Sequence, residues 1–213
     1  GAAPGGADIT ITGAVSDPGG DTVLQVQAGD GDHLVRFQQG LDVQGLETLA
    51  GSYSVRNDGS ASFVAAPGFA HTGALQMGSS EAMLTFAAGL DTTTGPAVTR
   101  LAGTFLATGG DIAVSNLRAQ AAGATLETQA GDVTVSGSLG GPGDLTILAS
   151  DLATVQPDVP LPAGEPLVND LYVQGASVVS YGTDTTGDQT YVCGPDGTVE
   201  FRSTYRLGGG DFT

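Results

Sequence analysis

Two aspartates in a glycine-rich turn are the first residues whose type and spacing suggest chemistry. Asp30 and Asp32 stand two positions apart in the segment Ala-Gly-Asp-Gly-Asp-His. Two carboxylates at this spacing can reach one hard cation such as Ca²⁺, which prefers oxygen ligands. The repeated Gly-Gly-x-Gly-x-Asp nonapeptide of calcium-binding solenoids is missing, so a solvated acidic turn is the competing interpretation. Asp30 and Asp32 are therefore the candidate Ca²⁺ ligands, and we expect no other cofactor.

A second group of charged residues lies near the C-terminal end of the sequence. Arg202 and Arg206 are close together, and Asp184, Asp188 and Asp196 precede them. Enzymes that cleave acidic polysaccharides need a base that takes a proton and clustered carboxylates that hold Ca²⁺, and these residue types fit that demand. Lysine, the other base that such enzymes use, is absent from the chain. A polysaccharide-active enzyme therefore stays an alternative, ranked below simple glycan binding.

The remaining reactive side chains form no catalytic motif. His33 and His71 lie outside any metal-binding spacing, and a surface or turn position is the simpler interpretation for both. The sequence contains no Gly-x-Ser-x-Gly elbow and no phosphate-binding loop. Cys193 is the one cysteine, and we expect it to be a small, partly buried residue. We predict no catalytic residue and no enzymatic activity.

The composition restricts the partners. The 213 residues carry 23 acidic and 6 basic side chains, which gives a formal net charge of −17. A chain this acidic is repelled by phosphate backbones, so we expect no nucleic-acid partner. No apolar run approaches the roughly 18 residues that a membrane helix needs, so we expect no membrane insertion. We also expect both ends of the sequence to be cuts within a longer chain, whose remainder is then a partner.

Short β-strands are the elements that would position these residues. Apolar and polar residues alternate over short stretches between Gly, Asp or Pro, which is the pattern of strands and turns. Several of these strands open with an aspartate, at Asp8, Asp111, Asp132, Asp144 and Asp170. An aspartate at such a corner can accept hydrogen bonds from the amides that follow it in the chain.

Internal repetition favours a parallel β-helix over a sandwich or a barrel. The pattern Phe-x-x-Gly-Leu-Asp begins at Phe37 and again at Phe86, and this offset fits two turns of roughly 20–25 residues each. One turn cannot bury its own apolar face, so such a fold is stable only through its neighbouring turns. We therefore predict an all-β chain that forms a single parallel β-helix (β-solenoid) of roughly nine turns over residues 1–213. Gly40–Leu49 and Leu117–Ala124 are the segments that could instead form short helices.

One segment does not fit the strand pattern. Residues 151–169 contain Pro157, Pro160, Pro162 and Pro166, and proline cannot donate a hydrogen bond to a strand ladder. We expect this segment to leave the sheet as a protruding proline-rich loop. Either it binds a ligand or it is a connection without a special purpose, and the sequence leaves both interpretations open.

Several short segments follow one another in an order that is typical of one family. They are Gly-Ser-Tyr-Ser-Val at 51–55, His-Thr-Gly-Ala-Leu-Gln-Met-Gly at 71–78, Leu-Thr-Phe-Ala-Ala-Gly-Leu at 84–90, Leu-Ala-Gly-Thr at 101–104, Gly-Asp-Val-Thr-Val-Ser-Gly-Ser-Leu-Gly-Gly at 131–141 and Gly-Asp-Gln-Thr-Tyr at 187–191. Together they resemble the passenger repeats of filamentous-haemagglutinin-like exoproteins, the large adhesins of Gram-negative bacteria. The resemblance covers most of the chain.

This resemblance implies a right-handed β-helical stalk that takes part in adhesion, aggregation or biofilm formation. It implies a protein that is secreted or lies on the outer-membrane surface of a Gram-negative bacterium. The partner it implies is a glycan or protein ligand on a host or neighbouring-cell surface. The family offers no catalytic residues to carry over. We therefore expect a structural, adhesive segment, with a glycan-binding module as the alternative.

Overall fold

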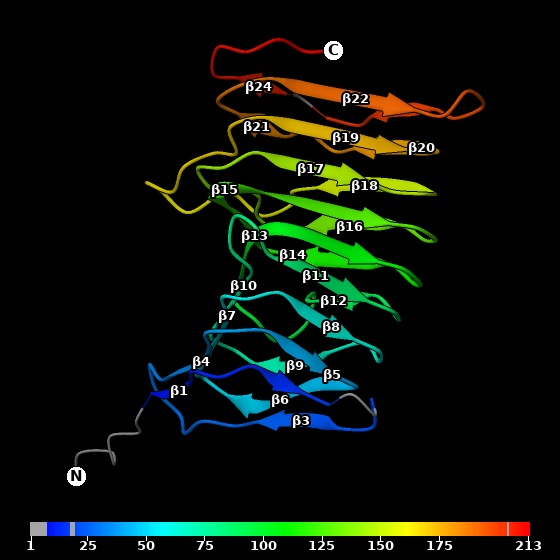
Figure 1. Ribbon diagram of the computed structural model, residues 1–213. Coiled ribbons are helices and arrows are strands. Elements are labelled where there is room, and N and C mark those ends of the chain that lie inside the picture. The colour runs from blue at the N-terminus through cyan, green and yellow to red at the C-terminus, as the bar shows by residue number, and fades with distance from the viewer. Residues whose placement is uncertain (1–7, 18–19, 204) are drawn as a thin grey trace.

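The protein is a right-handed parallel β-helix of about nine turns, as the sequence predicts (Figure 1). The computed structural model describes residues 8–17, 20–203 and 205–213, and every regular element in this part of the chain is a β-strand. In Figure 1 the chain climbs from the N-terminus at the bottom to the C-terminus at the top. We find no helix that could span a membrane among the described residues.

The solenoid has three faces, which we call faces 1, 2 and 3 in the order in which the chain visits them. Face 1 consists of β1 (Ile9–Ile11), β4 (Leu34–Phe37), β7 (Ser54–Asn57), β10 (Ala74–Met77), the first halves of β13 (Val98–Ala107) and β15 (Leu117–Thr128), β21 (Asp184–Thr185) and β24 (Arg206–Leu207). Face 2 consists of β2 (Val15–Ser16), β5 (Leu41–Val43), β8 (Ala61–Phe63), β11 (Met83–Phe86), the second halves of β13 and β15, β17 (Leu145–Leu148), β19 (Leu171–Gly175) and β22 (Gln189–Cys193). Face 3 consists of β3 (Val23–Val26), β6 (Gly45–Gly51), β9 (Gly68–His71), β12 (Leu90–Asp91), β14 (Ile112–Ser115), β16 (Val133–Ser136), β18 (Leu152–Gln156), β20 (Ser177–Ser180) and β23 (Val199–Phe201).

Within each sheet, a strand pairs with the strand of the turn below and the strand of the turn above, and the ladder of face 3 is interrupted between β9 and β12. The pairs between the described strands are parallel, and paired residues lie between 17 and 26 positions apart in the chain. Parallel strands need a long connection between them, and here the other two faces of the same turn supply that connection. The stability of the fold therefore comes from contacts between neighbouring turns.

Apolar side chains point into a narrow interior and stack on those of the next turn. Phe63, Phe86 and Phe105 lie on successive turns of face 2 and are fully buried. The ring centroids of the first pair are 5.4 Å apart, and those of the second pair 6.4 Å. Full burial of one such side chain contributes roughly 1.5–3 kcal/mol of hydrophobic free energy.

The aspartates that open the strands connect neighbouring turns. A carboxylate oxygen of Asp111 accepts a hydrogen bond from the amide of Asp132, one turn above, at 2.9 Å. In the same way Asp170 accepts from Asp188 at 2.9 Å, and Asp188 accepts from Asp211 at 2.7 Å. These carboxylates therefore bond the amide of the next turn, whereas the sequence suggested the amides that directly follow them.

Two details of the sequence interpretation are wrong. Phe37 ends a strand of face 1, whereas Phe86 ends a strand of face 2, so their offset spans two turns and one additional corner. The repeated pattern therefore forms the corner between two faces, and it occurs at two different corners of the solenoid. The reason is that each corner needs only a Gly-containing turn between two strands. Gly40–Leu49 and Leu117–Ala124 form strands, not helices, because each finds a paired strand on both sides.

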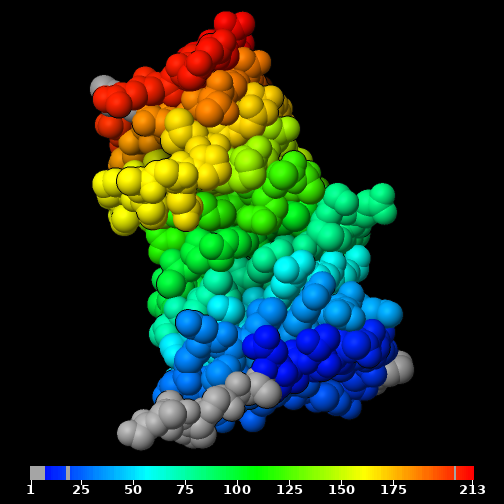
Figure 2. Space-filling model, turned by 90° about the vertical axis from the view of Figure 1, so that its left-hand side faces the viewer, coloured from blue at the N-terminus to red at the C-terminus, as the bar shows by residue number. Residues whose placement is uncertain are grey.

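The proline-rich loop is shorter than predicted. Residues 152–156 form β18, which pairs with β16 and β20, so the prediction of an irregular segment over 151–169 is wrong for this part. The loop itself comprises residues 157–167, after which Val168 bridges to Thr185 on face 1. Figure 2 shows this segment, in yellow, standing out from the side of the molecule on which face 1 lies.

Candidate functional site

A groove opens on face 1 between the proline-rich loop and the last turns of the solenoid. Its volume is about 360 Å³, which is within the usual range of small-ligand sites. The wall on the loop side is apolar and consists of Leu139, Pro157, Val159, Pro160, Leu161 and Leu167. The wall on the solenoid side is mainly polar and consists of Tyr181, Gly182, Thr183, Asp184, Ser203 and Arg206.

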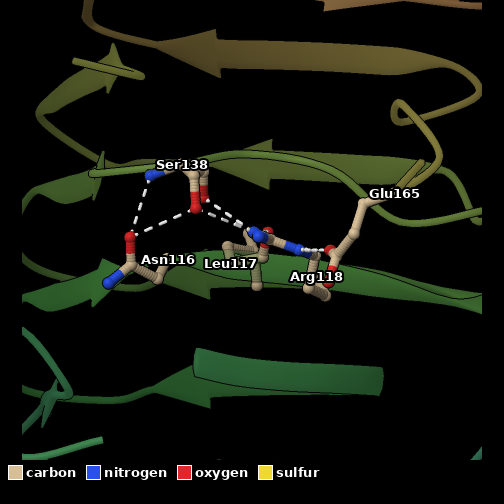
Figure 3. Close-up of polar contacts among 5 residues, drawn as sticks. All are labelled: Asn116, Leu117, Arg118, Ser138 and Glu165. Carbon is tan, nitrogen blue, oxygen red and sulfur yellow. Dashed lines mark hydrogen bonds and ion pairs between the residues drawn. The ribbon is translucent and has the colours of Figure 1, made fainter. Parts of the chain in front are cut away.

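A buried arginine holds the loop against the solenoid (Figure 3). Arg118 lies at the start of β15, and only 7% of its side chain is exposed. Its Nε donates to the Glu165 carboxylate of the loop, while Nη1 donates to the carbonyl oxygen of Leu117 at 3.0 Å and to Ser138 Oγ at 3.0 Å. Ser138 is in turn held by Asn116, whose Oδ1 accepts from the Ser138 amide at 3.0 Å. A buried guanidinium is costly without a negative partner, so Arg118 favours the position of the loop in which Glu165 reaches it.

Backbone hydrogen bonds fix the start of the loop. The amide of Val159 donates to the carbonyl oxygen of Gly137 at 3.3 Å, and the amide of Gly137 donates to Asp158 Oδ1 at 2.9 Å. Val159 is nevertheless 50% exposed, and Pro160 beside it is exposed as well. The loop therefore presents apolar side chains to the groove from a defined backbone position.

On the polar wall, one arginine orients the single aromatic ring of the groove. Arg202 Nη1 donates to the Tyr181 hydroxyl at 2.5 Å, and the guanidinium carbon lies 5.2 Å from the centre of the Tyr181 ring. Arg202 also donates two hydrogen bonds to the Glu200 carboxylate, at 2.7 and 2.8 Å. These bonds hold the pKa of Glu200 below its usual value. The ring of Tyr181 is thus held in place by a charged pair.

Asp184 and Arg206 leave their hydrogen-bonding groups available to a ligand. They are directly paired neighbours on adjacent turns of face 1, and both are exposed. Within the described residues, neither side chain makes a hydrogen bond or an ion pair. A carboxylate and a guanidinium on one wall, opposite prolines and aliphatic side chains on the other, suit a ligand with one polar and one apolar face. A pyranose ring is such a ligand, because its hydroxyl groups can bond charged side chains while its C–H face packs against apolar groups.

The charged residues that the sequence places near the C-terminal end do not form one cluster. Arg206 and Asp184 line the groove, and Arg202 supports it through Tyr181. Asp188 lies at the corner between faces 1 and 2, where its carboxylate accepts the bond from the next turn. Asp196 lies in the turn that follows β22, outside the groove. The grouping of three aspartates that a Ca²⁺-dependent lyase would need is therefore not formed by these residues.

Asp30 and Asp32 lie at the corner that precedes β4, and both are exposed. Gly31 between them donates its amide hydrogen to Ser52 Oγ at 2.8 Å, which fixes the turn. Across the described residues, no group of three or more His, Cys, Asp or Glu side chains is arranged to hold a metal ion. The Ca²⁺ site at Asp30 and Asp32 stays a prediction.

The prediction of a surface or turn position is wrong for His71. This residue ends β9 and is fully buried, with its ring stacked on Tyr53 at a centroid distance of 5.5 Å. Its Nδ1 lies 2.8 Å from Thr48 Oγ1, and its Nε2 is buried without a hydrogen-bond partner in the described structure. Burial lowers the pKa of His71 from 6.5 to about 4. The sequence interpretation missed this burial because His71 ends a short strand led by glycine, whose pairing with β6 contains a register shift between Thr48 and Gly51.

The groove itself was only partly visible in the sequence. The four prolines marked the loop, but the role of Arg118 in holding it could not be found, because Arg118 and Glu165 are far apart in the chain. Comparison with known proteins adds no assignment, since no family model, no curated protein and no solved structure matches this chain.

Proposed function

We propose that this chain is a structural and adhesive segment of a large surface protein, in which a β-solenoid presents a binding groove on one face. The observation that carries the proposal is the arrangement of its longest loop. The ion pair between Arg118 of the solenoid and Glu165 of the loop holds residues 157–167 in place as one wall of the groove. Connections between rigid strands are the usual place for ligand-binding groups, because the scaffold positions them precisely.

The sequence supports an adhesive role in particular. Its short segments resemble filamentous-haemagglutinin-like exoproteins, and a stack of parallel turns is a stiff element that can hold a binding surface away from a cell. The net charge of −17 keeps such a surface soluble and limits nonspecific attachment to other anionic surfaces. We therefore place the protein outside a Gram-negative cell, where its partner is a ligand on a host or neighbouring cell.

The test is attachment of the bacterium that carries this gene. Antibody against the purified chain should label intact, unpermeabilised cells, and an excess of the soluble chain should reduce their attachment to a surface or to one another. A matched variant in which residues 157–167 are replaced by a short Gly-Ser connection should compete less well. Labelling that requires permeabilised cells, or attachment that is unaffected by either form, would contradict the proposal.

A second candidate function is a glycan-binding module, and the two-sided character of the groove favours it. Tyr181, Asp184 and Arg206 on one wall face prolines and aliphatic side chains on the other. Glycan-array binding should be lost in Arg206→Gln and weakened in Tyr181→Ala. If binding also requires Ca²⁺, then a chelator and the paired change Asp30→Asn and Asp32→Asn should abolish it. Array binding that both groove variants retain would place the glycan elsewhere.

A further inference from the structure

A row of long polar side chains runs along the outside of face 1, on the N-terminal side of the groove. Arg36, Arg56, Gln76 and Arg100 lie on four consecutive turns and are directly paired with one another. All four side chains are half-exposed. The residues directly before and after each of them in its strand are buried and point inward. We call these four residues the arginine stripe. With adjacent strands about 4.8 Å apart, the stripe is roughly 14 Å long.

The stripe ends where the proline-rich loop begins. Arg100 pairs with Arg118 of the next turn, and Arg118 is covered by the loop and neutralised by Glu165. The next pairing partner is Gly140, which has no side chain. The stripe and the groove therefore lie on the same face as two separate surfaces.

One carboxylate organises the first half of the stripe. Asp58 Oδ2 accepts from Arg36 Nε at 2.6 Å, and Asp58 Oδ1 accepts from Arg56 Nε at 2.5 Å. Both guanidinium groups are thereby held in defined positions, while part of their donor groups stay unused. Arg100 makes no hydrogen bond or ion pair with another described side chain. The stripe thus carries three positive charges against one negative charge.

This local excess of positive charge contrasts with the rest of the chain. The chain has six basic residues in all and a net charge of −17, yet three of the six stand in one row. The outward positions next to the row, at Ser54 and Ala74, carry short neutral side chains. A narrow anionic chain can lie against the stripe beside these short side chains. The carboxylate of Asp58, on the other side of Arg56, is already paired with Arg36 and Arg56.

We propose that the arginine stripe binds an extended acidic polysaccharide that carries carboxylates along its length. Guanidinium groups recognise carboxylates through paired, charge-assisted hydrogen bonds, and Gln76 can bond hydroxyl groups between them. The spacing supports this choice, because one sugar unit of an extended polysaccharide advances by about the same distance as one turn of the solenoid. A nucleic-acid duplex fits less well, since its dense charge would meet the acidic remainder of the molecule. This site goes beyond the groove and does not depend on it.

The experiment uses the whole chain and a fluorescein-labelled galacturonate oligomer long enough to span four turns, followed by fluorescence anisotropy at low salt. The methyl-esterified form of the same oligomer is the uncharged control probe. We expect binding of the charged probe that weakens as salt is raised. Arg100→Gln should weaken it about tenfold, since it removes the least neutralised charge. Asp58→Asn should strengthen binding, because it removes the carboxylate that neutralises part of the charge of Arg36 and Arg56.

Arg206→Gln is the matched control, because it removes an exposed arginine of the same face inside the groove. It should leave binding to the stripe unchanged, and thermal unfolding should confirm that all variants fold. No binding of the charged probe, equal binding of the esterified probe, or an unchanged affinity in Arg100→Gln would overturn the proposal. A loss in Arg206→Gln that equals the loss in Arg100→Gln would move the polymer to the groove. Tighter, Arg100-dependent binding of single-stranded DNA or polyglutamate would overturn the assignment to a polysaccharide.

Discussion

Acidification should destabilise the N-terminal half of the solenoid through His71. In the folded protein the pKa of this buried imidazole is about 4, whereas in the unfolded chain it returns to about 6.5. Between these two values the unfolded state binds more protons than the folded state. The free energy of unfolding therefore falls as the pH is lowered through this range, and the loss is complete once the pH lies below the folded-state pKa.

The magnitude follows from the two pKa values. One pKa unit corresponds to about 1.4 kcal/mol, so the full difference is about 3 kcal/mol, of which about 2 kcal/mol should be lost between pH 7 and pH 5. The structural cause is the enclosure of the ring between Tyr53 and Thr48, with Nε2 buried and without a partner. A protonated imidazole would place a positive charge in the core, with the N–H group at Nε2 lacking a hydrogen-bond partner.

Urea unfolding followed by circular dichroism, at several pH values between 7 and 5, measures the effect. His71→Asn should be less stable at pH 7 because it loses ring packing, but its stability should depend much less on pH than that of the parent. His33→Asn removes the other histidine and serves as the matched control, and it should retain the pH dependence of the parent. If His71→Asn and the parent lose the same free energy between pH 7 and pH 5, then the burial argument for His71 is wrong.

Three further substitutions test the loop, the core and the contact between turns. Glu165→Gln removes the carboxylate that neutralises Arg118, and limited proteolysis within the loop should become about tenfold faster; an unchanged rate would mean that this pair does not hold the loop. Phe86→Ala opens a cavity in the aromatic stack and should lower the free energy of unfolding in urea by about 3–5 kcal/mol, whereas a loss below about 1 kcal/mol would show a loosely packed interior. Gly141→Ala would place a methyl carbon 2.1 Å from a backbone carbonyl oxygen of the preceding turn at a φ of +116°, and should cost at least about 2 kcal/mol. Gly164→Ala, at a φ of +86° with open space around it, is the control with backbone strain alone, and an equal loss in thermal stability for the two changes would exclude a steric cause.

Strands with clear alternation were predictable from the sequence. The strand that Asp132 opens, as predicted, is Val133–Ser136, and Leu34–Phe37 and Met83–Phe86 show the same alternation. In each of them a buried apolar residue alternates with a more exposed neighbour, and this period of two is a property of the strand itself. Strand β18 escaped prediction, because a segment directly before prolines has a weak local signal.

The positions of chemical groups across turns were not predictable in this way. Arg36, Arg56 and Arg100 stand in one row only because each turn has its own length, and the insertions in each corner decide which residues face each other. The same is true of Arg118 and Glu165, which are separated by more than one turn in the chain and meet through the loop. The sequence also could not show that His71 lies inside, because its burial depends on the stacking of β9 upon β6.

The amino-acid sequence alone determined that this protein is built from short strands separated by turns, because alternation and turn residues act over a few neighbouring positions. It also determined the formal net charge of −17, since every charged residue contributes to that charge wherever it lies. Only the tertiary structure decided which side chains share a groove, a row or the core. The physical reason is that paired residues on neighbouring turns lie 17 to 26 positions apart in the chain, and such distant pairings leave no signal in the local sequence.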